Sequence, residues 1–304
     1  TTQSASHSPQ PTTAYMVGLW AGRVLKSPTS VAGPGRTATL GAPDRPRRAG
    51  TGDSERRTYN VPARPPHPMT VSEDTREDLA EALYRALRDV EPIDRLTADH
   101  DLTIEDAYDV QSRLIDRRLD DGATVVGHKV GLTSQGIQDQ LGVDQPDFGR
   151  LLDSMFVEGR AIPGGELIAP RIEPEIGFLL GEALDPPVSY LDVLEATSAV
   201  VPVLEVIDSR VRDWDIRIHD TIADDASSAL YLAGESTSPV EGRDLSLEGL
   251  KLYRNGVLES SGVGAAVLDH PARSVAWLAN TLADLDERLE AGHVVLSGSL
   301  VPAT

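Results

Sequence analysis

The order of helical and strand patterns along the chain limits its fold more than any other feature. Helical periodicity is strongest at 75–87 and 103–122, whereas strand patterns dominate after residue 170. No strand–helix–strand rhythm and no Gly-rich phosphate loop interrupts this order. The pattern predicts an α+β protein, with an N-terminal helical region followed by a largely β core.

Local end signals define the predicted helices. Thr75 is placed to cap the first helix, and Thr103 with Asp106 resembles a capping box at the start of the second. A longer third helix is predicted over 271–292, with Pro271 in its first turn and a terminating Gly292. The apolar spacing within each range predicts one buried stripe per helix.

Strand signals fill the second half of the chain. Asn255-Gly256 lies between two short β-patterned runs, which is a strong hairpin signal. The segment 145–155 contains Pro146 and Gly149, and it is predicted to be a loop. Strands are predicted within 124–134 and at 171–180, 198–207, 228–233, 250–254, 257–260 and 293–297.

The first 68 residues differ in composition from the rest. They are rich in Pro, Ser, Thr, Gly and Arg, and they hold nine basic and three acidic residues. We expect segment 1–68 to be a disordered basic extension that is not native; a basic tail that binds a partner is the alternative. The remaining chain is divided into a helical part with the Lys and Asp loops, 69–165, and a β-rich catalytic core, 166–304.

Charge and missing residue types exclude several classes of function. Residues 69–304 hold 45 acidic and 19 basic residues, which excludes a general nucleic-acid binder. The absence of Cys excludes disulfides and thiolate chemistry. No apolar run approaches the length of a membrane span, so we expect a cytoplasmic protein. The acidic, Arg-over-Lys composition suits a halophilic source; an ordinary acidic enzyme from a GC-rich genome is the alternative.

Three carboxylates lie in strand patterns that are otherwise apolar. Glu173 and Glu175 are two residues apart in "RIEPEIGFLL", so their side chains share one face of the strand, and Glu205 lies within "VVPVLEVIDSR". Buried carboxylates that converge need a positive charge among them. Mg²⁺ or Mn²⁺ fits an all-oxygen set of ligands. The alternative is a solvated acidic face.

Lys129 is unusual because the globular part of the chain contains only one other lysine, Lys251. Arg keeps its proton near neutral pH, whereas burial can tune the proton affinity of Lys. A lysine retained in an arginine-rich chain therefore indicates either chemistry or tight packing of an ammonium group.

Several motifs together resemble the 2-keto-4-pentenoate hydratase family of the fumarylacetoacetate hydrolase superfamily. They are "GHKVGLTSQGIQDQLGVDQPDFGRLLDSM", "PRIEPEIGFLL", "VPVLEVIDSRVRDWDIRIHDTIADDASSA" and "SGVGAAVLDHPARSVAWLANTL", followed by "LEAGHVVLSGSL". The resemblance begins near residue 75 and continues to the end of the chain. It implies that the mixed β-sheet core has the type of the superfamily's C-terminal domain.

The resemblance assigns roles to individual residues. Glu173, Glu175 and Glu205 match the family's metal ligands, and Lys129 and Asp147 match its catalytic pair. Two further residues are assigned to substrate binding. Ser297 is expected to bond a substrate carboxylate, although it could merely end a strand; Arg210 is expected to pair with Asp208 near Glu205.

The implied reaction is the metal-dependent addition of water to 2-hydroxypenta-2,4-dienoate, giving 4-hydroxy-2-oxopentanoate in the meta-cleavage degradation of aromatic compounds. One alternative is a 4-oxalocrotonate decarboxylase, and another is a non-catalytic acidic partner subunit. A homo-oligomer that associates with a pathway enzyme is also expected. The family continues with a further short β segment beyond "SGSLVPAT", so we expect a truncated C-terminal end.

Overall fold

The computed structural model describes residues 69–304 except 135, 137, 140–142, 159–160 and 163–164, and it describes the backbone alone of residues 15–20. The elements below belong to one compact unit. The predicted disorder and partner binding of 1–68 otherwise fall outside the described residues.

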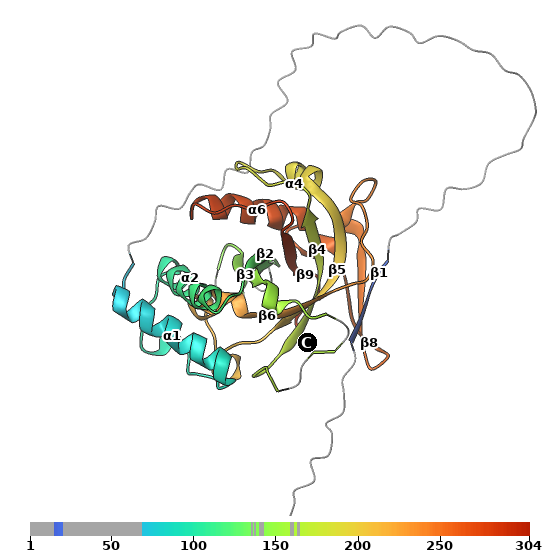
Figure 1. Ribbon diagram of the computed structural model, residues 1–304. Helices are drawn as coiled ribbons and strands as arrows, with labels where there is room; N and C mark the ends of the chain where they lie inside the picture. The colour runs from blue at the N-terminus through green and yellow to red at the C-terminus, as the bar shows by residue number, and fades with distance from the viewer. Residues whose placement is uncertain are drawn as a thin grey trace, which may run out of the picture. The chain divides into compact units, whose positions relative to one another are not determined.

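A six-stranded mixed sheet forms the centre of the protein, in the order β3-β2-β9-β4-β5-β6 (Figure 1). β2 pairs with β9 in parallel, and the other neighbours are antiparallel. This arrangement confirms the α+β prediction. The strands are β2 (Val125–Gly131), β3 (Asp147–Leu152), β4 (Arg171–Leu180), β5 (Thr197–Ile207), β6 (Ser228–Ala233) and β9 (Val294–Ser299).

Strands from both sides of the predicted division at residue 165 belong to this one sheet. β2 and β3 come from 69–165, while β4, β5, β6 and β9 come from 166–304. The parallel pairing of β2 with β9 joins the two ranges in the middle of the sheet. The predicted catalytic pair on β2 and β3 is thereby built into the same sheet as the predicted metal ligands.

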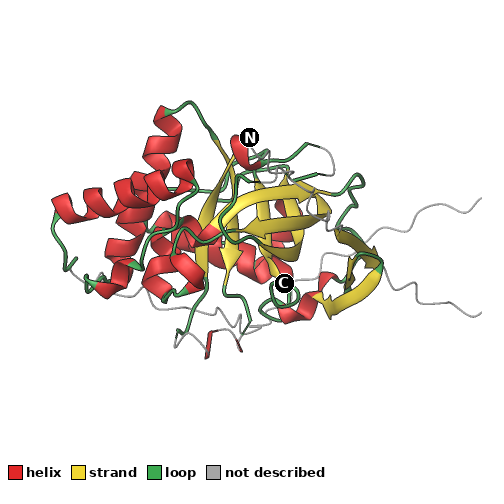
Figure 2. Cartoon of the chain, turned by 90° about the horizontal axis from the view of Figure 1, so that it is seen from below, coloured by secondary structure: helices red, strands yellow, loops and turns green. Residues whose placement is uncertain are grey.

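The early helices pack against each other beside the β3 end of the sheet, as Figure 1 shows, and Figure 2 shows helices gathered to one side of the strands. Gln111 on α2 connects them to the sheet, since its Nε2 donates to the carbonyl oxygens of Phe148 (3.0 Å) and Ile222 (2.8 Å). The α-helices are α1 (Glu73–Asp89), α2 (Ile104–Asp120), α4 (Tyr190–Ala196), α5 (Ile218–Ala223) and α6 (Pro271–Ala283).

One face of the sheet is apolar and packs against α6. Phe178 of β4 and Val295 of β9 are fully buried there, beside Val275 and Leu278 of the helix. Complete burial of one such side chain stabilises the fold by about 1.5–3 kcal/mol. Because strand side chains alternate, the residues between these positions point to the opposite face. That second face carries the acidic side chains of β4.

A separate three-stranded sheet has the order β1-β7-β8. It comprises β1 (Tyr15–Trp20), β7 (Gly249–Arg254) and β8 (Val257–Val263). Asn255-Gly256 turns β7 into β8 with φ of 52° and 80°, as the hairpin signal predicts. The strand at 15–20 differs from the predicted disorder of 1–68: "YMVGLW" has strong β propensity, and β7 offers it an edge to pair with.

Three local predictions are corrected by the structure. Ser72, rather than Thr75, caps α1, because its side chain accepts from the Thr75 backbone N–H. The predicted helix 271–292 ends at Ala283, and Asp286 adopts a left-handed φ of 57° that a continuing helix does not allow. Much of the predicted loop 145–155 is β3, because tertiary pairing with β2 outweighs the Pro and Gly signals. Among the described residues, no helix has the length and apolar character needed to cross a membrane.

Candidate metal centre and active site

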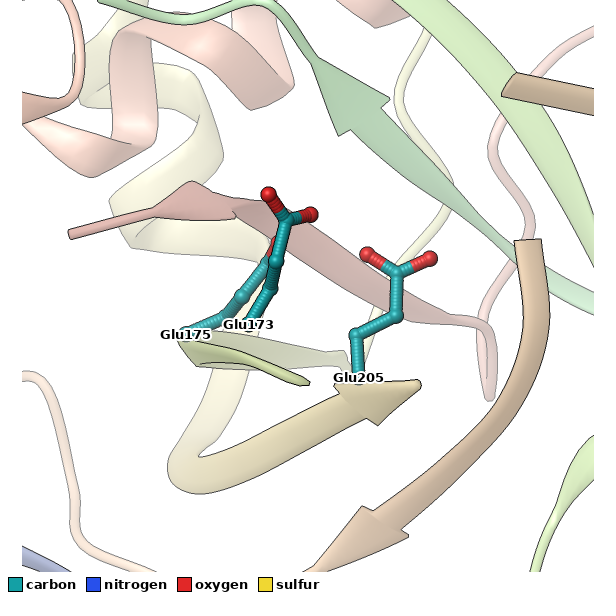
Figure 3. Close-up of side chains that lie close together, drawn as sticks. All are labelled: Glu173, Glu175 and Glu205. Carbon is teal, nitrogen blue, oxygen red and sulfur yellow. The ribbon is translucent and has the colours of Figure 1, made fainter. Parts of the chain in front are cut away.

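The pairing of β4 with β5 brings the three glutamates together. Glu173 lies directly opposite Glu205 in the antiparallel register, and Glu175 follows two residues later on the same face. One carboxylate oxygen from each residue lies within 4.8 Å of the other two. Figure 3 shows the three side chains rising from the two strands toward a common region. The predicted trio is therefore assembled as the sequence indicates.

Few protein groups neutralise these acids. Glu175 is 1% exposed and Glu205 is fully buried. The Gly298 N–H donates to Glu175 Oε2 at 2.8 Å, whereas neither oxygen of Glu205 has a hydrogen-bond partner among the described residues. Native proteins rarely leave buried carboxylate oxygens without partners. Open acceptors of this kind fit a positively charged ligand.

Burial raises the proton affinity of the acids on β4. Loss of hydration raises the pKa of Glu173 to about 7, with a further rise from Glu205 that the Lys129 ammonium opposes. Loss of hydration also raises the pKa of Glu175 well above its ordinary value, reinforced by the charges of Glu205 and Glu173. These shifts mark a site whose ionised form is unfavourable without a cation.

Lys129 is held at the edge of the carboxylate trio. It is 3% exposed on β2, and its Nζ lies 3.5 Å from Glu205 Oε1. Nζ also donates to the Ala226 carbonyl oxygen at 2.9 Å. Burial alone lowers the pKa of this amine, but Glu205, Glu173 and the other nearby acids outweigh burial and raise it. The predicted catalytic lysine thus shares one electrostatic environment with the predicted metal ligands.

Asp147 approaches the same place from β3. It pairs with Gly131 across the strands, and it is 2% exposed. A Cβ at Gly131 would lie 2.2 Å from Asp147 Oδ1 and 3.5 Å from Lys129 Nζ, so the missing side chain leaves space where both groups meet. Burial raises the pKa of Asp147 to about 6, partly offset by Lys129. The catalytic pair predicted from the resemblance is therefore brought together.

The two predicted substrate-binding residues are placed differently. The Ser297 hydroxyl is fully buried and has no hydrogen-bond partner among the described residues, so it is free to donate. Arg210 is also buried, but its guanidinium bonds Asp224 and the carbonyl oxygens of Asp208 and Ser228. Its ion-pair partner is Asp224, not the predicted Asp208. Asp208 instead accepts the backbone N–H groups of residues 168 and 169.

One contact of the site was missed by sequence reasoning. The carbonyl oxygen that accepts the hydrogen bond from Lys129 Nζ belongs to Ala226, and the sequence assigned no role in the site to this alanine. A backbone acceptor leaves no chemical signature in its own side chain. The nearest available signal was Gly131, two residues after Lys129, which marks the close approach of the Asp147 side chain and not that of Ala226.

The residues fit a hard divalent cation. All three convergent donors are carboxylate oxygens, and both oxygens of Glu205 lack a hydrogen-bond partner among the described residues. Lys129 and Asp147 lie beside the donors without belonging to them. The geometry defines a class of candidate site: three convergent carboxylates that suit an oxygen-ligated cation, beside a buried Lys–Asp pair.

Comparison with known proteins identifies the family. No family model matches the chain. It is 46% identical to a 2-keto-4-pentenoate hydratase of Paraburkholderia xenovorans over 230 residues, covering 75% of this chain and 86% of the relative. It is 43% identical to a 2-hydroxyhexa-2,4-dienoate hydratase of Comamonas testosteroni over 231 residues, covering 74% and 88%. The chain belongs to the 2-keto-4-pentenoate hydratase family.

A solved structure of a related enzyme has the same fold. The 4-oxalocrotonate decarboxylase of Pseudomonas putida G7, complexed with magnesium and adipate, matches with a TM-score of 0.75 and 36% identity. The match covers 77% of this chain and 90% of the decarboxylase. The same decarboxylase has also been solved with calcium and acetate.

Proposed function

We propose that this chain is a divalent-metal-dependent hydratase that adds water to 2-hydroxypenta-2,4-dienoate, the enol form of 2-oxopent-4-enoate. The observation that carries the proposal is the convergence of Glu173, Glu175 and Glu205 beside Lys129. Relatives at 46% identity that are named for this activity support it. The product is 4-hydroxy-2-oxopentanoate, an intermediate type expected in the catabolism of aromatic compounds.

Glu173, Glu175 and Glu205 would hold the cation, and Mg²⁺ or Mn²⁺ is the proposed ion because both accept oxygen ligands. When bound, it supplies Lewis-acid stabilisation of the negative charge that develops on the C2 oxygen of the substrate. Support for a divalent ion comes from the related decarboxylase, which is complexed with magnesium in one structure and calcium in another.

Lys129 and Asp147 move the protons in this proposal. The enol hydroxyl loses a proton and C5 gains one. Water then bonds to C4 through its oxygen and gives up a proton, and C3 gains a proton. Two neighbouring groups with unlike proton affinities suit such transfers, since one can donate while the other accepts. Burial raises the pKa of Asp147 to about 6, so this carboxyl exchanges its proton near neutral pH. The open Ser297 hydroxyl is a candidate partner for the substrate carboxylate.

The second candidate function is decarboxylation of 4-oxalocrotonate. The structural similarity to a 4-oxalocrotonate decarboxylase favours keeping it. Both substrates should be assayed with Mg²⁺ and with Mn²⁺. Release of CO₂ from 4-oxalocrotonate, without hydration of the dienoate, would replace the hydratase proposal. Metal binding without turnover of either substrate would instead support a non-catalytic acidic partner subunit.

The decisive experiment compares the parent chain with Glu175→Gln. The amide keeps the size of the side chain and removes a buried anionic ligand. We expect metal content to fall and turnover to drop by a factor on the order of 1,000, within the range that groups acting on the transition state contribute. Glu182→Gln is a matched control, because Glu182 is exposed on the turn after β4. Parent-like turnover by metal-free Glu175→Gln would remove the mechanism.

Assembly is proposed separately from catalysis. We expect a homo-oligomer, and association with a neighbouring pathway enzyme, because the family resemblance implies both. Sedimentation of the purified chain alone, and then mixed with a candidate enzyme that acts before or after it, tests each expectation. A monomer that stays monomeric in the mixture would contradict them.

A further inference from the structure

We propose that a left-handed turn over residues 225–227 positions Lys129, and that Asp225 fixes this turn. The inference rests on the proposed catalytic role of Lys129. It adds Asp225 as a positioning residue, which acts through another group and does not itself touch the substrate. The observations that carry it are the backbone of the turn, the clamps on its two ends and the contact that it makes with Lys129.

The backbone of the turn is unusual for the residues that form it. Asp225, Ala226 and Ser227 have φ of 52°, 49° and 55°. Three successive non-glycine residues in this region are disfavoured, because their Cβ atoms crowd the backbone. Such conformations persist only where surrounding contacts hold them, and they concentrate at functional sites.

Two sets of contacts hold the turn. Arg210 clamps its flanks, because the guanidinium bonds Asp224 on one side and the Ser228 carbonyl oxygen on the other. Inside the turn, Asp225 Oδ1 accepts the Arg150 backbone N–H of β3 at 2.8 Å. Asp225 is 1% exposed, and its Oδ2 has no hydrogen-bond partner among the described residues. The Oδ1 bond therefore anchors the turn directly to the strand that carries Asp147.

Gly149 makes this anchoring possible. A Cβ at this position would lie 2.4 Å from the Asp225 carbonyl oxygen and 2.9 Å from Asp225 Oδ1. Any larger residue would push the turn away from β3. The glycine of "DFGR" thus serves the approach of the turn, and the same motif supplies both Asp147 and the Arg150 N–H.

The purpose of the arrangement follows from the middle residue. The Ala226 carbonyl oxygen accepts from Lys129 Nζ at 2.9 Å. A carbonyl oxygen can only accept, so Nζ must keep a hydrogen directed at the turn in either protonation state. The other positions on Nζ are then left for the side where Glu205 and Asp147 lie. The turn therefore sets the direction in which Lys129 can give or take a proton.

The test compares Asp225→Ala with Asp225→Asn in the full-length chain loaded with Mn²⁺. Alanine removes the acceptor for the Arg150 N–H, whereas asparagine keeps an acceptor oxygen of the same shape. We expect Asp225→Ala to lower kcat by about 10-fold to 100-fold, with KM and Mn²⁺ affinity unchanged and the pH–rate profile shifted. Asparagine should restore most of the lost kcat.

Asp153→Ala is the matched control, because Asp153 also accepts backbone N–H groups, from Thr124 and Ser154, at the far end of β3. It should alter neither kcat nor the pH profile. Unchanged kcat and pH profile in folded Asp225→Ala would overturn the inference, and so would equal losses in the Ala and Asn variants. Failure of the proposed function is a separate result, since the parent chain would then lack hydratase activity at the outset.

If Asp225→Ala does not fold, Gly149→Ala tests the same contact from the other side. Its circular dichroism and bound Mn²⁺ should match those of the parent, while kcat falls with a shifted pH profile. A folded Gly149→Ala enzyme with parent kinetics would overturn the inference.

Discussion

Glutamates on the surface of α1 and α2 and glutamates of the candidate metal centre lie in opposite environments. On the helices, Glu77 lies 2.9 Å from Arg113, and Glu81 lies 3.2 Å from Arg117. Hydrogen bonds from Arg113 and Arg85, respectively, lower the pKa of Glu77 and Glu81. These carboxylates have arginine partners and contact water, so solvent screens their charges.

The glutamates of the candidate metal centre differ from those of the helices in burial, in partners and in the direction of the pKa shift. Glu173, Glu175 and Glu205 lie close together, with Lys129 as their nearest cation, and burial raises the pKa of Glu173 and Glu175. Buried charges of one sign destabilise a fold unless something compensates them. The helical acids therefore contact solvent and arginines, whereas the strand acids lie close together at a cost in stability that the proposed cation would offset.

The largest of these effects should come from Glu173→Gln, a change within the carboxylate trio. Removing one of three repelling carboxylates should raise the unfolding free energy of the metal-free protein by about 1–2 kcal/mol at pH 8. The same change should weaken Mn²⁺ binding by at least about 100-fold and reduce turnover to a similar degree. Chemical denaturation and metal titration measure the two effects. A metal-free variant less stable than the parent would show that the trio is not repulsive.

A smaller effect should appear in the pH dependence of stability. The folded pKa values of Glu173 and Asp147, about 7 and about 6, exceed their ordinary values of 4.5 and 3.8. Folding therefore takes up protons between about pH 4 and pH 7, and the unfolding free energy of the metal-free protein falls as pH rises through this window. Taken together, the two differences set an upper limit of about 6 kcal/mol on this loss.

The measurement is denaturation at pH 5 and pH 8, with and without Mn²⁺. Bound cation requires ionised carboxylates, so it should stabilise the protein more at pH 8 than at pH 5. The difference between the parent and Glu173→Gln isolates the contribution of Glu173 from those of the other titrating groups. The predicted sign would be wrong if the metal-free parent gained stability relative to Glu173→Gln between pH 5 and pH 8.

The smallest effect should follow from Arg117→Ala on the surface of α1 and α2. This change removes the contacts of Arg117 with Glu77 and Glu81, which keep water and other arginines as partners. We expect a loss of at most about 1 kcal/mol in unfolding free energy, with metal affinity and turnover unchanged. Thermal unfolding and a standard assay suffice. A loss of activity would show that the two regions are coupled.

The sequence predicted much of the fold because its local signals agree with the tertiary structure. β4 runs over the predicted 171–180, where apolar residues alternate with others, and the Thr103–Asp106 capping box opens α2 as expected. β3 was missed because Gly149 resembles a loop residue when read locally. The glycine is needed there because Asp225, which is distant in sequence, approaches the strand closely.

The candidate site shows the same limit. Glu173, Glu175 and Glu205 could be found because carboxylates in apolar strand patterns conflict with local expectation, and Lys129 stood out because lysine is scarce. The true surroundings of Arg210 could not be found, since Asp208 and Asp224 are equally plausible partners by residue type. The Ala226 contact depends on a backbone conformation that alanine does not favour, so no residue pattern indicates it.

The parallel pairing of β2 with β9 has a consequence for biosynthesis. Lys129 lies beside Leu296 in that pairing, and β9 separates its strand from the one that carries Glu175. During translation, β2, β4 and β5 leave the ribosome well before the strand that must sit between the first two. A nascent chain can therefore form its helices and hairpins early, but the candidate site is completed only after β9 has been synthesised.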